Sequence, residues 1–336
     1  MNCLCCGKPL PDSAFPDTWH KSCIRSFFGT NALPELNLSN EVLLALAEKS
    51  TGQGHTVPGV QKKLSLHLST EGRTARFTLV DYPAGYILKP QSDLYPALPE
   101  AEFLVMQMAR QTGIDTVPHA LVFLGEENPS AAYITRRVDR SLPEKKTGYV
   151  RRLAMEDFCQ LNFRLTEDKY RGSYELCAKT ILRRSDRPGL DLSELFLRLV
   201  FSFITGNSDM HLKNFSLIET GEDSRHYVLA PAYDLLPVNL IIPEDTEETA
   251  LALNGKKRHL HRNDFLRFAD TAGIPRGAAG KMIDRVLSLV DRYHTLCQSS
   301  FLPEPMKVRF DTLIDARQNA LAGNSVPAHP APGIAL

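Results

Sequence analysis

Residues 206–217, GNSDMHLKNFSL, gather polar side chains between two apolar segments, and this stretch decides the expected fold. The preceding run Leu195–Ile204 is apolar apart from Arg198 and Ser202, which is typical of a buried helix. The chain returns to apolar residues at Phe215. A partly buried loop with this many polar groups is costly unless the groups are paired or functional. The pattern therefore predicts a functional loop after a core helix.

The spacing of the acidic and amide side chains indicates phosphoryl transfer. Asp209 and Asn214 have the spacing D-x-x-x-x-N, and Asp234 follows twenty residues after Asn214, in PAYDLLP. Protein kinases place a catalytic-loop Asp, a metal-binding Asn and a second metal-binding Asp in this order. Taken alone, D-x-x-x-x-N is also explained by local turn hydrogen bonds. His211 and Lys213 either touch phosphate or support the loop.

A nucleotide site needs further groups for the phosphates, and candidates precede the loop. Lys89 ends the apolar strand GYILKP, where its ammonium group can reach phosphate oxygens, and Glu102 or Glu100 from the next helix can hold it. The glycine-containing stretch 51–66 lets the backbone approach a phosphate, but it fits neither G-x-G-x-x-G nor the P-loop pattern. A lysine on an edge strand and a glycine turn before a strand remain the simpler explanations of each signal alone.

Hydrophobic patterning predicts a two-lobed α+β fold. Residues 1–35 read as neither a helix nor a strand pair, and a short helix is predicted over Glu41–Lys49. Strand-like segments and one helix (about Glu100–Thr112) fill residues 51–138. The chain after Asp139 is mostly helical, with helices predicted near Ala154–Phe163, Tyr174–Arg184, Leu192–Thr205, Arg262–Ala272 and Ala278–Ser300. We therefore expect a β-rich N-lobe and a larger all-helical C-lobe, with the ligand cleft between them. The predicted divisions are a Cys-rich knot with a leading helix (1–50), the N-lobe (51–138), the C-lobe (139–322) and a disordered tail (323–336).

These motifs together resemble the HipA family of serine/threonine kinases, and most closely its shorter HipT-like members. GNSDMHLKNFSL resembles the family's catalytic loop, PAYDLLP its metal-binding Asp segment, VPGVQKKLSL its G-x-Q-x-K phosphate loop and YILKP its ATP-lysine strand. TRRVDR followed by MEDFCQL resembles the stretch that joins the lobes. The similarity runs in order over about residues 51–310. It implies a protein-kinase-like fold and a kinase that uses ATP and Mg²⁺.

Residue by residue, the resemblance implies that Asp209 is the catalytic base and that Asn214 and Asp234 bind Mg²⁺. It implies that Lys89, which Glu102 or Glu100 can hold, contacts the ATP phosphates. The other residues implied or proposed to line the ATP site are Thr56, Val57, Gly59, Val60, Gln61 and Lys63 of the phosphate loop, Arg136 to Val138 of the hinge, and His211 and Lys213 of the catalytic loop.

The resemblance also implies partners and one departure from the family pattern. Implied partners are a protein substrate such as an aminoacyl-tRNA synthetase, a DNA-binding antitoxin and a small HipS-like protein. HipT-like kinases carry two autophosphorylated serines before the loop glycine, whereas Thr56 and Pro58 stand there in this chain. Pro58 cannot accept phosphate, so any autophosphorylation in this loop is expected at Thr56.

Four of the seven cysteines lie in the first 23 residues. Cys3 and Cys6 form C-x-x-C, and His20 and Cys23 form H-x-x-C, an order that fits a structural Cys₃His zinc site. Cys5 is an alternative ligand, and free thiols are the alternative explanation of the whole cluster. A segment this short and rich in proline would depend on the metal for its stability.

Composition restricts the remaining functional classes. The 336 residues carry equal numbers of acidic and basic side chains, so direct nucleic-acid binding over a large basic surface is not expected. The N-terminus lacks the order of a signal peptide and no stretch is long enough to span a membrane, which predicts a cytoplasmic protein. Two alternatives to a protein kinase remain: a nucleotide-binding scaffold that sequesters a partner, and a kinase acting on a small molecule.

Overall fold

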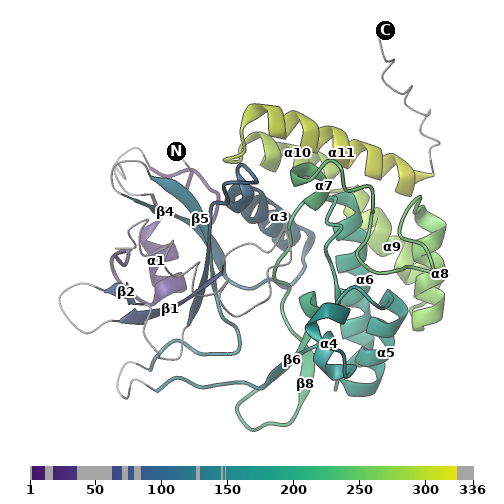
Figure 1. The fold of residues 1–336 in the computed structure, drawn as a ribbon, viewed down its shortest axis with the longest axis horizontal. Coiled ribbons are helices and arrows are strands. Elements are labelled where there is room, and N and C mark those ends of the chain that lie inside the picture. Colours follow the sequence, from purple (N-terminus) through teal and green to yellow (C-terminus); the bar gives the residue numbers. More distant parts are fainter. Residues whose placement is uncertain are drawn as a thin grey trace.

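The computed structural model describes residues 2–11, 18–35, 63–69, 75–78, 85–125, 129–144, 147 and 149–323. A sheet-rich lobe lies beside a larger helical lobe (Figure 1). The sheet-rich lobe contains α1 (Lys21–Phe28), β1 (Leu64–Ser69), β2 (Arg76–Thr78), β3 (Tyr86–Pro90), α3 (Leu98–Thr112), β4 (His119–Leu124) and β5 (Ser130–Arg136). The leading helix predicted at 41–49 and the tail after residue 323 fall outside the described residues.

The large sheet is antiparallel throughout, with the strand order β2-β1-β3-β5-β4. Its five strands were predicted from their alternating or apolar patterns, and the structure confirms them. Helix α3 packs on β4 and β5, with Pro99 in its first turn and Gly113 at its C-terminal cap. Gly113 has φ +88°, a conformation that favours glycine, and a Cβ there would also meet Arg285. The helix therefore ends where the chain must turn back to form β4.

The helical lobe is built around α6 (Pro188–Ile204), most of whose residues are buried against α5, α8, α9 and α11. Its buried charged residues include Arg198, which donates to Glu194 (2.8 Å) and to the carbonyl of Ala230 (2.9 Å). The other elements of this lobe are β6 (Met155–Asp157), α4 (Phe158–Leu161), α5 (Tyr174–Arg184), β7 (Ser216–Glu219), β8 (Tyr227–Leu229), α7 (Val238–Ile241), α8 (Arg262–Ala272), α9 (Arg276–Leu287), α10 (Val290–Gln298) and α11 (Glu304–Ala322), together with the short 3₁₀ turns Thr166–Asp168 and Leu212–Asn214.

The structure corrects the predicted all-helical lobe in one respect. Residues 155–157, predicted as the start of a helix, form β6, which pairs with β7, and β7 pairs with β8. The helix begins only after Asp157, because the Asp157 side chain accepts from the backbone of Gln160 and caps it. This small sheet holds the chain directly after the polar loop, since β7 begins at Ser216.

Three further differences concern helix ends. The first 35 residues, expected to lack helices, contain α1. The single helix predicted over 278–300 is two helices, α9 and α10, which meet at residues 288–289. Helix α11 was not assigned from the sequence at all; it packs against α6, α7, α8, α9 and α10. Local periodicity did not locate these boundaries, because tertiary packing determines where each helix stops.

A backbone link between the lobes positions the segment that carries Asp234. Val117 donates to the carbonyl of Ala232 (3.0 Å), and Ala232 donates to the carbonyl of Asp115 (2.6 Å). These residues follow α3, so the segment leading to Asp234 is bound to the turn between α3 and β4. The carboxylate of Asp234 is therefore fixed relative to the sheet-rich lobe.

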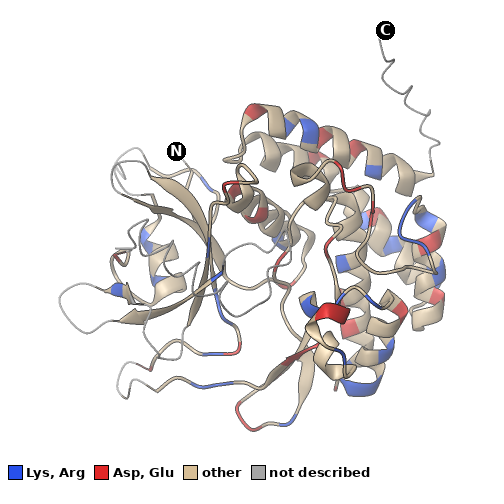
Figure 2. Ribbon diagram, viewed as in Figure 1, with Lys and Arg blue, Asp and Glu red and all other residues tan. Residues whose placement is uncertain are grey.

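The described residues show no feature of a membrane protein or of a strongly basic surface. None of their helices is both long and apolar enough to cross a bilayer. Acidic and basic side chains alternate over the helical lobe in Figure 2 rather than collecting by sign. This distribution agrees with the equal numbers of acidic and basic residues in the sequence.

Candidate active site

The polar loop after α6 is a tightly bonded turn whose side chains are mostly buried. Gly206 opens it with φ +66°, and a Cβ at this position would lie 2.6 Å from the Leu313 side chain of α11. The amide of Asn207 donates to Ser202 at the end of α6 (2.8 Å), and the Ser208 hydroxyl donates to Asp245 (2.6 Å). These bonds explain how a polar segment follows an apolar helix without leaving the protein interior.

Asp209 and Asn214, predicted as a pair, are held together. The Asn214 side-chain amide donates to the Asp209 carbonyl (2.8 Å), which fixes the orientation of that side chain. Among the described residues no group bonds to the Asn214 Oδ1 atom. The Asp209 carboxylate accepts from the Tyr170 hydroxyl at Oδ1 (2.6 Å). Its second oxygen is therefore the atom that can accept a proton from an incoming hydroxyl.

Asp234 joins a chain of charges with the predicted phosphate lysine. Lys89 donates to Asp234 (2.5 Å) and to Glu102 of α3 (2.5 Å), and Lys63 donates to the other Asp234 oxygen (3.0 Å). Lys89 is 4% exposed and Glu102 is fully buried, so these two charges depend on each other and on Asp234. Glu102, rather than the alternative Glu100, is the partner of Lys89. Asp234 has φ +60°, a conformation that costs energy for a residue with a side chain.

The pKa values in this chain reflect burial and pairing. Burial would raise the pKa of Asp234, but Lys63 and Lys89 outweigh it and hold that pKa well below its usual range. Burial raises the pKa of Glu102 to about 6, although Lys89 acts in the opposite direction. Burial would lower the pKa of Lys89, and the two carboxylates raise it above normal instead. At neutral pH Lys89 is therefore protonated, and its partners Glu102 and Asp234 are both ionised.

His211 is buried in the loop, whereas Lys213 is partly exposed and bonds to a residue outside the loop. His211 is 6% exposed, its Nδ1 has no partner among the described residues, and its ring lies edge-on to Tyr170 at 5.1 Å. Burial lowers the pKa of His211, so the ring is neutral at physiological pH. Lys213 donates to Asp157 (2.7 Å), the N-cap of α4. Of the two readings left open for these residues, the contacts favour support of the loop.

Within the described part of the chain, one backbone amide of the predicted hinge has no hydrogen-bond acceptor. Arg136 donates its amide to Pro118 (2.9 Å), and Arg137 donates its amide to Gly85 (2.9 Å). Val138 is partly buried, and its amide has no hydrogen bond within the described part of the chain. An adenine contact through this segment would therefore use Val138. The Arg136 side chain turns away to the carbonyl of Ser26 (3.1 Å).

The phosphate loop predicted around Gly59 is described only at Lys63. Its other members lie outside the described residues: Thr56, Val57, Pro58, Gly59, Val60 and Gln61.

Tyr170 and Asp157 are site residues that the sequence did not indicate. Tyr170 contacts Asp209 across 39 positions of sequence, and no local pattern marks such a pair. Asp157 does have a signal, because D-x-x-Q is a capping box, as the structure shows. Tyr133 was also missed: Lys89 lies 5.3 Å from the centre of its ring, and the Tyr133 hydroxyl is buried without a partner among the described residues.

The donor set fits a nucleotide with Mg²⁺. Mg²⁺ takes oxygen ligands and is usually held by one or two protein groups, with phosphate and water completing its shell. Asp234 and the free Oδ1 of Asn214 supply such oxygens. Lys63 and Lys89 each bond to one oxygen of Asp234, and they supply the cations that phosphate groups require.

Comparisons with known proteins agree with this geometry. The family described as HipA-like C-terminal domain matches residues 55–293. A protein of Haemophilus influenzae named as a candidate kinase is 28% identical over 81% of this chain and 83% of its own length. Another of Sinorhizobium fredii, also named as a candidate kinase, is 32% identical over 68% of this chain and 56% of its own length.

Shewanella oneidensis provides a relative by sequence and by structure. Its HipA, named a serine/threonine-protein kinase toxin, is 25% identical over 69% of this chain and 54% of its own length. A solved complex of HipA, HipB and operator DNA from this organism contains a chain with a TM-score of 0.67 and 22% identity, covering 80% of this chain and 65% of that one. The structural likeness confirms the two-lobed kinase-like fold, while this chain spans only about half of the longer relatives. The family match over most of its length shows that the chain belongs to the HipA-like C-terminal domain family of kinases.

Proposed function

We propose that this protein is an ATP- and Mg²⁺-dependent protein serine/threonine kinase of the HipA type. The observation that carries the proposal is the buried Lys89–Glu102–Asp234 chain beside an Asp209 that keeps one carboxylate oxygen available. Such a chain is costly in a fold that binds nothing. A bound nucleotide would supply phosphate oxygens for Lys63 and Lys89, and its metal ion would bind to Asp234.

The chain's own residues account for the acceptor side of the reaction. Tyr170 fixes the carboxylate of Asp209 through one oxygen, and the other accepts the proton of the attacking hydroxyl. Asn214 is held by the Asp209 backbone through its amide nitrogen, and its Oδ1 would then bind the metal ion. Bound Mg²⁺ would neutralise charge on the phosphate oxygens. Lys89 would hold the phosphates in place through a cation that Glu102 keeps oriented.

The biological setting is proposed from the family relationship. The solved relative is a HipA in complex with HipB and operator DNA, which supports an antitoxin partner and a role as a toxin. A translation component such as an aminoacyl-tRNA synthetase, a HipS-like partner and autophosphorylation at Thr56 are proposals that rest on the resemblance of the sequence motifs.

The test is phosphate transfer from γ-labelled ATP with Mg²⁺ in a lysate of the host, using the native chain and Asp209→Asn. Asp223→Asn is the matched control, because Asp223 is exposed and its left-handed conformation is one that Asn tolerates. We expect labelling of a discrete protein by the native chain and the control, and its loss in Asp209→Asn. Label appearing only in a small molecule, or no transfer despite measurable ATP binding, would contradict the protein kinase proposal. Phosphoamino acid analysis then distinguishes serine and threonine from tyrosine.

A further inference from the structure

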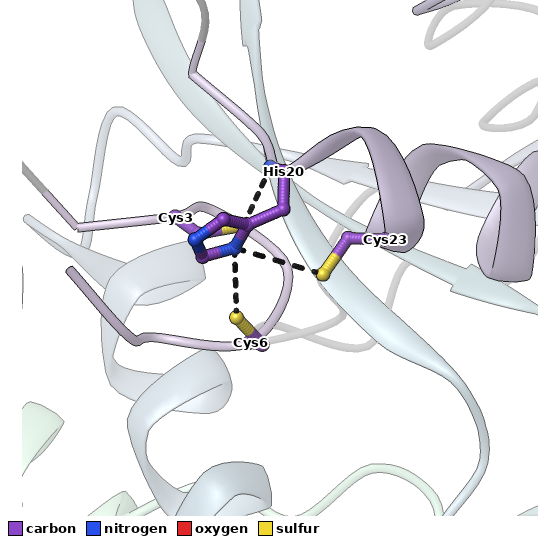
Figure 3. A group of neighbouring side chains, drawn as sticks. All are labelled: Cys3, Cys6, His20 and Cys23. Atoms are coloured by element: carbon purple, nitrogen blue, oxygen red, sulfur yellow. Dashed lines mark hydrogen bonds between the residues drawn. The ribbon is translucent and has the colours of Figure 1, made fainter. Parts of the chain in front are cut away.

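The structure brings together the four N-terminal side chains that the sequence marked as metal ligands. The ligand atoms of Cys3, Cys6, His20 and Cys23 all lie within 4.8 Å of one another, and this is the only such His/Cys/Asp/Glu group among the described residues. Figure 3 shows their side chains converging from two segments, the turn around Cys3 and Cys6 and the start of α1. Cys5, the alternative ligand, is not in the group.

Two distances between donor atoms are close to those of a tetrahedral site. The His20 Nδ1 atom lies 3.3 Å from the Cys6 sulfur and 3.9 Å from the Cys23 sulfur. With metal–sulfur and metal–nitrogen bonds of about 2.3 and 2.0 Å, donor atoms around tetrahedral Zn²⁺ lie roughly 3.5–3.8 Å apart. The observed distances lie on either side of this range. Three thiolates and one imidazole are soft, tetrahedral ligands that select Zn²⁺ over Mg²⁺ or Ca²⁺.

The surroundings prepare His20 for this role. Its Nε2 lies 3.1 Å from the carbonyl of Pro9, which can only accept, so Nε2 carries the proton and donates. Nδ1 therefore keeps its lone pair, and Figure 3 shows this atom within reach of the Cys6 and Cys23 sulfurs. Zinc-bound histidines commonly donate their other nitrogen to a carbonyl in this way. The backbone amide of His20 also donates to the Cys3 sulfur (3.4 Å), as a thiolate acceptor requires.

The backbone of the first segment forms the turn that a C-x-x-C ligand pair needs. Gly7 follows Cys6 with φ +69°, and its amide donates to the Cys3 carbonyl (2.9 Å). The Cys3 amide donates to Lys8 (2.8 Å), which closes the turn. Cys3 is fully buried and forms no disulfide, so without a metal its thiol would be enclosed among three other ligand groups that lack a shared partner.

We propose that Cys3, Cys6, His20 and Cys23 bind one structural Zn²⁺. This ion would hold together two N-terminal segments, the turn around Cys3 and Cys6 and the helix α1, which both contact the strands of the sheet-rich lobe. The first segment meets the lobe through the Leu4 carbonyl, which accepts from Leu121 of β4 (2.8 Å). It also accepts from Gln107 of α3 at the Cys5 carbonyl (3.0 Å).

The second segment, α1, meets the same lobe independently. The Phe27 carbonyl accepts from the Tyr86 hydroxyl of β3 (3.1 Å), and the Phe27 and Phe28 rings pack on Tyr86. A metal held by both segments would make these two attachments support each other. The proposal does not depend on kinase activity.

The test is the metal content of the full chain, purified without chelators and analysed by elemental mass spectrometry. We expect about one Zn²⁺ per chain in the native protein and in Cys5→Ser, and less than about a fifth of that in Cys6→Ser and Cys23→Ser. Cys5→Ser is the matched control, because it removes a neighbouring thiol outside the cluster. Equal zinc in Cys23→Ser, or its loss in Cys5→Ser, would overturn the proposed ligand set.

A spectroscopic test covers the case in which the cysteine variants fail to fold. The native chain is loaded with Co²⁺ in place of Zn²⁺ and its absorption is recorded. We expect thiolate-to-cobalt charge-transfer bands and the strong d–d bands of a tetrahedral site, which Zn²⁺ then removes. A native chain that binds neither metal overturns the proposal. So does a native chain whose mass is two hydrogens below the reduced value, since that indicates a disulfide between two of the thiols.

Discussion

Removing the Lys89 cation is expected to destabilise the sheet-rich lobe in a pH-dependent way. Lys89→Met leaves the fully buried Glu102 without its partner. Breaking a buried ion pair from one side costs about 3–5 kcal/mol, because the remaining charge stays buried and uncompensated. At about 2–4 °C per kcal/mol for a domain of this size, the melting temperature should fall by roughly 6–20 °C at pH 8.

The cost should shrink as the pH falls. Glu102 has a pKa of about 6 with Lys89 present, and Lys89 acts to lower it, so the pKa rises further in Lys89→Met. A carboxyl group whose folded pKa lies above its unfolded value of 4.5 costs stability above the folded pKa and costs none below the unfolded one. We therefore expect much of the difference between native and Lys89→Met to disappear between pH 8 and pH 5.

A double variant makes the reasoning refutable. The double variant Lys89→Met with Glu102→Gln removes both charges, so its melting temperature at pH 8 should be higher than that of Lys89→Met. The difference in melting temperature between the native protein and the double variant should depend little on pH. Lys257→Met is the control, since Lys257 and Glu247 form an exposed pair worth less than about 1 kcal/mol. Thermal unfolding followed by circular dichroism at pH 5 and 8 measures all four proteins. A double variant that melts no higher than Lys89→Met at pH 8, or equal losses in Lys89→Met at both pH values, would refute the buried ion-pair account.

Two further predictions concern the loop and the last helices. Tyr170→Phe removes the hydrogen bond to Asp209, so kcat should fall about tenfold, which corresponds to about 1.4 kcal/mol. The KM for ATP should stay unchanged, and steady-state kinetics measures both constants. An altered KM with an unchanged kcat would argue against a positioning role for Tyr170. His294 loses hydration on burial, but bonds to Asp311 and Asp315 outweigh this and raise its pKa above normal. That stabilisation is present below the unfolded pKa and is lost as the pH rises through the folded one. His294→Gln should therefore lower the melting temperature, measured by thermal unfolding, more at pH 6 than at pH 8.5. Equal decreases at the two pH values would contradict a stabilising role for the bonds of His294 to Asp311 and Asp315.

The sequence was informative about the site where spacing along the chain equals proximity in space. Asp209 and Asn214 lie in one turn, and the Asn214 side-chain amide donates to the Asp209 carbonyl, a local bond of the kind that the sequence offered as the alternative to a functional pair. The strand segments of the large sheet and the helix before Gly113 also followed from local patterns, because alternation and caps are local signals. Lys89 was recognisable as the last polar residue of an apolar strand, and its partner was narrowed to two neighbouring glutamates.

What the sequence could not provide depends on contacts between distant segments. Tyr170 reaches Asp209 only because the lobe folds around α6, and nothing near Tyr170 in the chain marks that contact. The strand β6 has three residues and exists because β7 lies beside it. The left-handed conformation of Asp234 is likewise not marked in the sequence, although aspartate adopts this conformation more often than most residues with a side chain.

If the proposed nucleotide binds at Asp234, the ion chain there has a consequence for how free nucleotide and its magnesium complex would be distinguished. Lys63, Lys89, Glu102 and Asp234 form a neutral group as they stand, with as many negative as positive charges. A polyphosphate that arrives alone must draw both lysines away from Asp234 and leave that carboxylate beside its own negative charge. A polyphosphate that arrives with a divalent cation exchanges partners instead: the lysines pass to the phosphates and the cation passes to Asp234. Electroneutrality in a confined space would thus make the two ligands bind as one, each raising the affinity for the other.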